Sequence, residues 1–153
     1  MNYWYRNFLS GEDWMKWKKV NNIDDIKQLN ELYDFFEDSV LVGMNYISGN
    51  NVDEELVGHL RNMNDLKVTF QRLDRKPFCI ELWFTHTKRL NFRFINPADN
   101  LLSDIMFAKI CKNDDSIFWT LWEDFNPNCK DHLSYTDLTI IEAEGLKWRI
   151  VED

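Results

Sequence analysis

The chain has 153 residues, a length typical of one domain, and carries 26 acidic and 18 basic side chains for a net charge of −8 at pH 7. This charge repels phosphate groups, so we expect neither nucleic acid nor a membrane as a partner, whereas a basic protein partner is compatible with it. The 15% aromatic content, with eleven Phe and seven Trp, excludes a disordered chain. We therefore predict that residues 1–153 form a single folded domain.

The three cysteines, Cys79, Cys111 and Cys129, are far apart and form no Cys-x-x-Cys pair. This spacing is typical of reduced, mostly buried thiols rather than of a disulfide framework. The first residues lack a basic region followed by an apolar run, and no apolar stretch is long enough to span a membrane. These features predict a cytoplasmic protein.

The first 20 residues are rich in aromatic side chains. Ser10 is a candidate helix cap, and Trp14 and Trp17 would then share one side of a short helix. We expect this segment to cover part of the core. The alternative is that its aromatic side chains line a pocket.

Residues 23–37 give the clearest helix prediction. Asn22 is a candidate N-cap, and Asp24 and Asp25 lie where the helix dipole favours negative charge. Apolar side chains recur at spacings of three and four residues and form one stripe: Ile23, Ile26, Leu29, Tyr33 and Phe36. The stripe predicts a helix that packs on a sheet.

Residues 39–47 predict a β-strand, and the Ser-Gly-Asn-Asn sequence that follows predicts a turn. The next segment, residues 52–65, is ambiguous. Its three consecutive acidic residues could open a short helix with Leu56 and Leu60 directed inward, or the segment could be a loop.

Residues 66–94 alternate apolar and polar side chains in three successive runs. The runs are residues 66–73, 78–84 and 89–94. A period of two predicts three strands with one face on the core, and the short segments between them predict hairpin turns. The predicted core face consists of Val68, Phe70, Ile80, Leu82 and Phe92.

The rest of the chain predicts four more short strands, the last two joined by a hairpin at Gly145. These strands are residues 104–112, 116–122, 138–144 and 146–151. The pattern indicates an α+β fold: a curved antiparallel β-sheet of about seven strands in meander order, with one main N-terminal helix packed on it.

The outer face of the central strands supplies the first candidate partner-binding residues, Glu81, Trp83 and Arg93. An aromatic residue beside an arginine is typical of interaction hot spots. The competing interpretation is a salt-bridged face on which the N-terminal segment covers Trp83, and we favour it because the N-terminal aromatic residues need a surface to pack on.

Asp53, Glu54 and Glu55 form the second candidate partner-binding group. Consecutive carboxylates accelerate association with a basic partner. The group would then act as one acidic patch on the surface.

The sequence shows no pattern for catalysis, a cofactor or a metal. His59, His86 and His132 are far apart, and no metal-ligand spacing or nucleophile–base motif occurs. With five glycines in the chain, a glycine-rich phosphate loop is not expected. We therefore predict a protein that is not an enzyme and has no cofactor and no metal site.

Four short motifs resemble those of a widespread group of small bacterial proteins of unknown function. The motifs are Asp38-Ser39, Tyr46-Ile47-Ser48-Gly49, Phe70-Gln71-Arg72 and Ile80-Glu81-Leu82. Proteins of this group are similar in style to the immunity proteins of bacterial toxin systems, which are small, acidic and cytosolic. The resemblance covers roughly residues 34–95 and implies no catalytic residues.

Two hypotheses for the function follow. The first is a non-catalytic bacterial protein-interaction domain, with an immunity-type inhibitor of a basic toxin as its specific form. The second is a small-molecule-binding domain with an aromatic pocket inside the curved sheet, lined by tryptophans such as Trp83, Trp119, Trp122 and Trp148.

Overall fold

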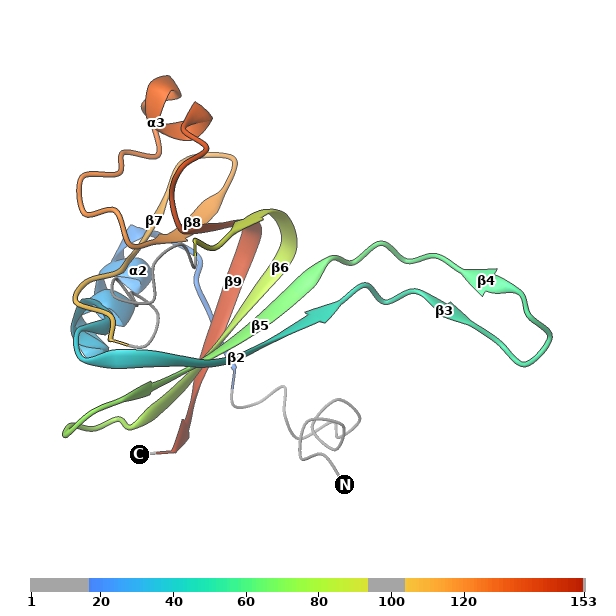
Figure 1. Ribbon diagram of the computed structural model, residues 1–153, viewed down its shortest axis with the longest axis horizontal. Helices are drawn as coiled ribbons and strands as arrows, with labels where there is room; N and C mark the ends of the chain where they lie inside the picture. The colour runs from blue at the N-terminus through green and yellow to red at the C-terminus, as the bar shows by residue number, and fades with distance from the viewer. Residues whose placement is uncertain (1–16, 94–103, 153) are drawn as a thin grey trace.

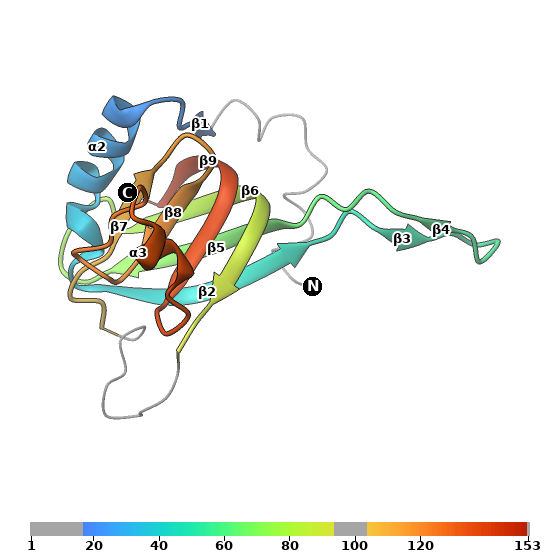
Figure 2. The same ribbon diagram turned by 90° about the horizontal axis from the view of Figure 1, so that it is seen from above.

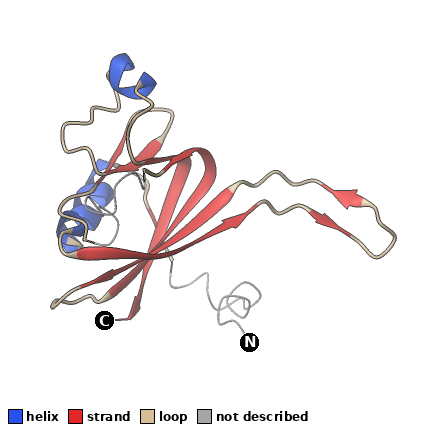
Figure 3. Cartoon of the chain, in the orientation of Figure 1, coloured by secondary structure: helices blue, strands red, loops and turns tan. Residues whose placement is uncertain are grey.

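The computed structural model describes residues 17–93 and 104–152, without the side chain of residue 152, and these form the predicted α+β fold (Figure 1). Seven antiparallel strands make one open sheet, and one main helix packs on it (Figure 3). The predicted N-terminal helix around Ser10 and Trp14 lies outside the described residues.

The strands of the main sheet are β1 Lys18–Lys19, β2 Ser39–Ile47, β5 Asp65–Arg72, β6 Cys79–Asn91, β7 Lys109–Lys112, β8 Ile117–Thr120 and β9 Ile140–Glu152. Their order is β2-β5-β6-β9-β8-β7, and β1 pairs with β9 beyond the end of β8. The order departs from a simple meander at one place, because β9, the last strand of the chain, lies between β6 and β8. A small separate sheet contains β3 Asn51–Val52 and β4 Gly58–His59.

Strands β6 and β9 are each continuous over 13 residues, so the hairpins predicted at residues 85–88 and at Gly145 are wrong. The polar residues at these two places mark bends instead of turns. In β6, His86 has a φ of +50° and the register with β9 shifts between Thr87 and Arg89. The shift means that β6 has one residue more than β9 at this point, which is a β-bulge. A bulge bends a strand and increases its twist, and this bend gives the sheet its curvature (Figure 2).

Helix α2, Ile23–Leu32, begins where the sequence predicts. The Asn22 side chain accepts a hydrogen bond from the Asp25 amide at 2.9 Å. The helix ends at Leu32, earlier than predicted, because residues 34–36 form a separate 3₁₀ turn, η2 Asp34–Phe36, with φ values of 46°, 49° and 59°. This left-handed turn still buries Phe36 completely.

Asn30 fixes α2 to the edge of the sheet. Its amide nitrogen donates to the Ile110 carbonyl at 2.8 Å, and its amide oxygen accepts from the Ile110 amide at 2.9 Å. The buried side chain thus replaces the strand that β7 lacks on its outer edge.

The main core lies between α2 and one face of the sheet. Of the predicted core residues, Val68, Phe70, Ile80 and Leu82 are fully buried, and Phe92 packs against them while partly exposed. A smaller apolar cluster lies on the opposite face, since Phe118 and its neighbour Trp119 point to opposite sides of β8. Its buried members are Phe118, Phe125, Leu138 and Ile140.

Residues 121–139, which include helix α3 Lys130–Ser134, cover this second cluster. None of the helices in the described residues is long and apolar enough to cross a membrane.

Candidate functional site: a protruding hairpin arm

Residues 48–64, which connect β2 to β5, project away from the body of the molecule as a two-stranded hairpin (Figure 1). We call this segment the arm. It extends from the end of the sheet opposite to α2 in both views (Figure 2). In its outer part, Asn51 pairs with His59 and Val52 pairs with Gly58.

The short helix considered for this segment does not form. Leu56 and Leu60, which that helix would have directed inward, are 85% and 75% exposed. The turn residues Gly49, Asn50, Asn62 and Asn64, spread over both sides of the segment, are the sequence signal that favours a hairpin over a helix.

The end of the arm is a tight turn organised by Asp53. One carboxylate oxygen of Asp53 accepts hydrogen bonds from the amides of Glu55 at 3.1 Å and Val57 at 2.9 Å. The other carboxylate oxygen lies 2.6 Å from Nε2 of His59. These contacts lower the pKa of Asp53, the hydrogen bond with His59 most of all.

Polar contacts also hold the base of the arm. The side-chain oxygen of Asn50 accepts from the amides of Arg61 at 2.6 Å and Asn62 at 2.9 Å. Gly49 has a φ of +73°, and a Cβ atom there would lie 2.6 Å from the sulfur of Met63. The arm therefore takes its shape from hydrogen bonds and close backbone packing, without a core of its own.

Apolar side chains are exposed along the arm despite the lack of a core. They are Val52, Leu56, Val57 and Leu60, all more than half exposed. An isolated two-stranded hairpin has marginal stability, and these side chains add little burial to it. Their exposure is consequently unfavourable for folding and favourable for binding.

Leu56 is the most unusual of the four. Its φ of +64° lies in the left-handed region, where a side chain costs about 1–2 kcal/mol and where turns of this kind prefer glycine. The chain therefore keeps a large apolar side chain at the tip in spite of both backbone strain and exposure.

The acidic candidates lie at this same tip. Asp53, Glu54 and Glu55 precede Leu56 directly, and Arg61 is the only arginine or lysine between residues 48 and 64. Glu54 and Glu55 are exposed, whereas the Asp53 carboxylate is engaged within the turn. The tip thus combines an exposed apolar anchor with negative charge.

The candidates on the central sheet are placed differently. Glu81 is 4% exposed and accepts two hydrogen bonds from Arg149, at 3.0 Å from Nε and 2.9 Å from Nη2. In the register of the sheet, Glu81 lies between Thr69 of β5 and Arg149 of β9, and Arg93 is not its neighbour.

Trp83 is 8% exposed, and its indole nitrogen donates to Asp65 at 2.9 Å. The ring of Trp17 packs edge-on against Trp83 with 5.3 Å between centroids, and Nζ of Lys147 lies 3.6 Å from the Trp83 ring centroid. Burial lowers the pKa of Lys147. The structure therefore has a salt-bridged face on which Trp83 is covered, and Glu81 and Trp83 do not form an exposed surface.

Arg93 lies two residues after the end of β6 and forms an ion pair with Asp137. Its amide donates to the Thr139 hydroxyl at 3.3 Å. It belongs to the contacts that hold residues 121–139 and does not share a surface with Glu81.

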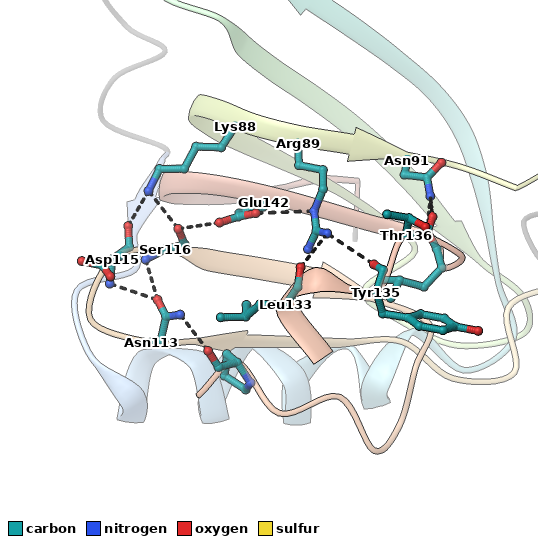
Figure 4. Close-up of polar contacts among 12 residues, drawn as sticks. Lys88, Arg89, Asn91, Asn113, Asp115, Ser116, Leu133, Tyr135, Thr136 and Glu142 are labelled. Atoms are coloured by element: carbon teal, nitrogen blue, oxygen red, sulfur yellow. Dashed lines mark hydrogen bonds and ion pairs between the residues drawn. The ribbon is translucent and has the colours of Figure 1, made fainter. Parts of the chain in front are cut away.

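A polar network fastens residues 121–139 to the sheet (Figure 4). The guanidinium of Arg89 donates to the Leu133 carbonyl at 3.1 Å and lies 3.5 Å from the Glu142 carboxylate. Ser116 donates to Glu142 at 2.9 Å, and Asn91 donates to the Thr136 carbonyl at 2.9 Å. Arg89 and Asn91 donate to backbone carbonyls of residues 121–139. The network therefore holds this segment in place over the second apolar cluster.

The four tryptophans considered for an aromatic pocket do not line one cavity wall. Trp119 is fully buried in the main core and packs against Phe36 and Phe70. Trp122 belongs to the second cluster on the other face, where its ring lies 4.3 Å from that of His132.

Within residues 17–93 and 104–152, no three His, Cys, Asp or Glu side chains are grouped so that they could hold a metal ion. Comparison with protein-family models, curated proteins and solved structures finds no match. The resemblance to small bacterial immunity-like proteins stays a prediction.

Proposed function

We propose that this chain is a non-catalytic bacterial protein-interaction domain that binds a basic protein through its arm, in the manner of an immunity-type inhibitor of a toxin. The observation that carries the proposal is Leu56, 85% exposed at the tip with a left-handed backbone. Strain of this kind persists where it serves a function. Full burial of such a leucine by a partner contributes about 1.5–3 kcal/mol.

The charges of the tip support a basic partner. Glu54 and Glu55 are exposed beside Leu56, and the whole chain has a net charge of −8. Carboxylates at the rim of an apolar anchor raise the association rate with a positively charged surface and select against acidic ones. A partner with basic side chains around an apolar recess fits this tip.

The first experiment uses Leu56→Gly, because glycine is the residue that the backbone at position 56 prefers. The full chain and this variant serve as baits in affinity purification from the organism that encodes them. The proposal predicts that a basic protein is recovered with the wild type and lost with Leu56→Gly. Met106→Ser is the matched control, since Met106 is 70% exposed and lies beside the bridge between Ser39 and Ile105, at the end of β2 away from the arm.

The recovered protein is then produced alone, and its affinity for both variants is measured at low and high salt. The proposal requires weaker binding at high salt and by Leu56→Gly, and equal binding by Met106→Ser. Retention of the partner by Leu56→Gly would contradict the arm as the interface. A partner whose own toxicity or activity is unchanged by a stoichiometric amount of this protein would contradict the inhibitor role.

A further inference from the structure

We infer that Asp53 is a positioning residue that shapes the tip of the arm, while Glu54 and Glu55 are the carboxylates that meet the partner. The inference rests on the proposed function and divides three adjacent acidic residues into two roles. Sequence alone gives them one role, because they form a single acidic run.

The contacts of Asp53 carry the inference. Its Oδ1 atom accepts from the amides of Glu55 and Val57, and its Oδ2 atom lies 2.6 Å from His59. Its backbone amide also donates to the Val57 carbonyl, and its backbone carbonyl accepts from the Leu56 amide. The acceptor capacity of this carboxylate is largely used inside the arm.

Glu54 and Glu55 are exposed, and no side-chain hydrogen bond or ion pair joins either of them to another residue in the described part of the chain. Both directly precede Leu56 in the chain, and their exposed carboxylates are available to a basic partner. Asp53 acts on the partner indirectly, because it holds the turn in which Leu56 keeps its left-handed backbone. Such preorganisation reduces the entropy that binding must remove.

Two substitutions at Asp53 distinguish its hydrogen bonds, which shape the turn, from the effect of its negative charge. Both turn amides bond the same oxygen, Oδ1, so Asp53→Asn keeps the acceptor and loses the charge, whereas Asp53→Ala loses both. The charge-removing controls are Glu54→Gln and Glu55→Gln, which leave the turn contacts intact.

Hydrogen exchange on the isolated full-length protein tests the positioning role without any partner. We expect Asp53→Ala to speed exchange at the Glu55 and Val57 amides about threefold or more, and Asp53→Asn, which keeps the acceptor but loses the charge, to speed it by a smaller factor. Exchange in β5 stays the same in every variant and reports that the domain is folded. Unchanged exchange in Asp53→Ala would overturn the inference, whether or not the arm binds a partner.

Affinity for the protein recovered with the wild-type bait tests the division of roles. We expect Asp53→Asn to bind nearly as the wild type does, Asp53→Ala to bind about tenfold more weakly, and the Glu54→Gln/Glu55→Gln double variant to lose affinity chiefly at low salt. Equal weakening by Asp53→Asn and Asp53→Ala would overturn the inference, because it would show that Asp53 contacts the partner through its charge. Loss of the wild-type interaction itself would instead contradict the proposed function and leave the exchange result to decide the role of Asp53.

Discussion

Thr85 and Gly145 face each other across β6 and β9, and a Cβ atom on Gly145 would lie 2.6 Å from the hydroxyl oxygen of Thr85. Thr85 directly precedes His86, whose positive φ marks the bend in β6. A glycine is required for this approach, and it lets both strands continue through the bend without a turn.

Replacement of Gly145 by alanine should therefore destabilise the domain. A forced contact of this size in a packed region costs about 1–3 kcal/mol, because the β-branched Thr85 has little freedom to move away. Denaturant unfolding measures the loss, and the double variant Thr85→Ala/Gly145→Ala should recover most of it. Equal stability of Gly145→Ala and the wild type would show that the strands separate easily at this point.

Removal of one partner from the buried ion pair of Glu81 and Arg149 should strongly destabilise the domain. The two side chains are 6% and 8% exposed, so Glu81→Leu leaves a buried guanidinium without its carboxylate and should cost about 3–5 kcal/mol. The apolar double variant Glu81→Leu/Arg149→Met should regain much of this stability. Lys27→Met, which breaks the exposed pair with Glu31, is the control and should change little.

Asn30→Ala should loosen the attachment of α2 to β7. The substitution leaves the buried amide and carbonyl of Ile110 without partners, each at a cost of about 1–3 kcal/mol. Gln28→Ala, on the exposed side of the same helix, serves as the control in thermal and denaturant unfolding. An equal effect of both substitutions would contradict the role of Asn30 as the closing group of the β7 edge.

The order of the arm should depend on acid through Asp53. Because the folded arm lowers the pKa of Asp53, the ionised carboxylate stabilises the arm above the ordinary pKa of 3.8, and this stabilisation is lost as pH falls through the lower folded value. Amide NMR spectra between neutral pH and pH 3 should show that Val57 and Glu55 lose their folded positions before β5 does. A simultaneous loss in both regions would contradict a local role for Asp53.

The thiol of Cys111 should react slowly with alkylating reagents. Burial raises its pKa to about 11 from the ordinary 9.0, so at pH 8 its thiolate fraction is about a hundredfold below that of a free thiol. Iodoacetamide labelling, followed by peptide mass spectrometry, should modify Cys111 about a hundredfold more slowly in the folded protein than in the unfolded chain. A model peptide that contains the same sequence gives the reference rate.

The periodicity of apolar residues was sufficient to predict the helix and the strands that bury one face in the core. The stripe that includes Ile26 and Leu29 predicted α2, and the alternation around Val68 and Leu82 predicted β5 and the first half of β6 with the correct face inward. A face in contact with a core must be apolar at the period of its backbone, so these elements are readable from sequence. A bend in a long strand carries the same polar residues as a turn, which is why β6 and β9 were divided in two.

The sequence by itself therefore determined the α+β class, the start of the main helix, the core face of the central strands and the acidic run at residues 53–55. Only the tertiary structure decided that β9 lies between β6 and β8, that Arg149 buries Glu81, and that residues 48–64 project as an arm with Leu56 at its tip. Periodicity reports which side chains need burial, but the partner that buries them depends on contacts between segments far apart in the chain. The exposure of Leu56 follows from such contacts, because a leucine becomes unusual only once the fold leaves it without a core to enter.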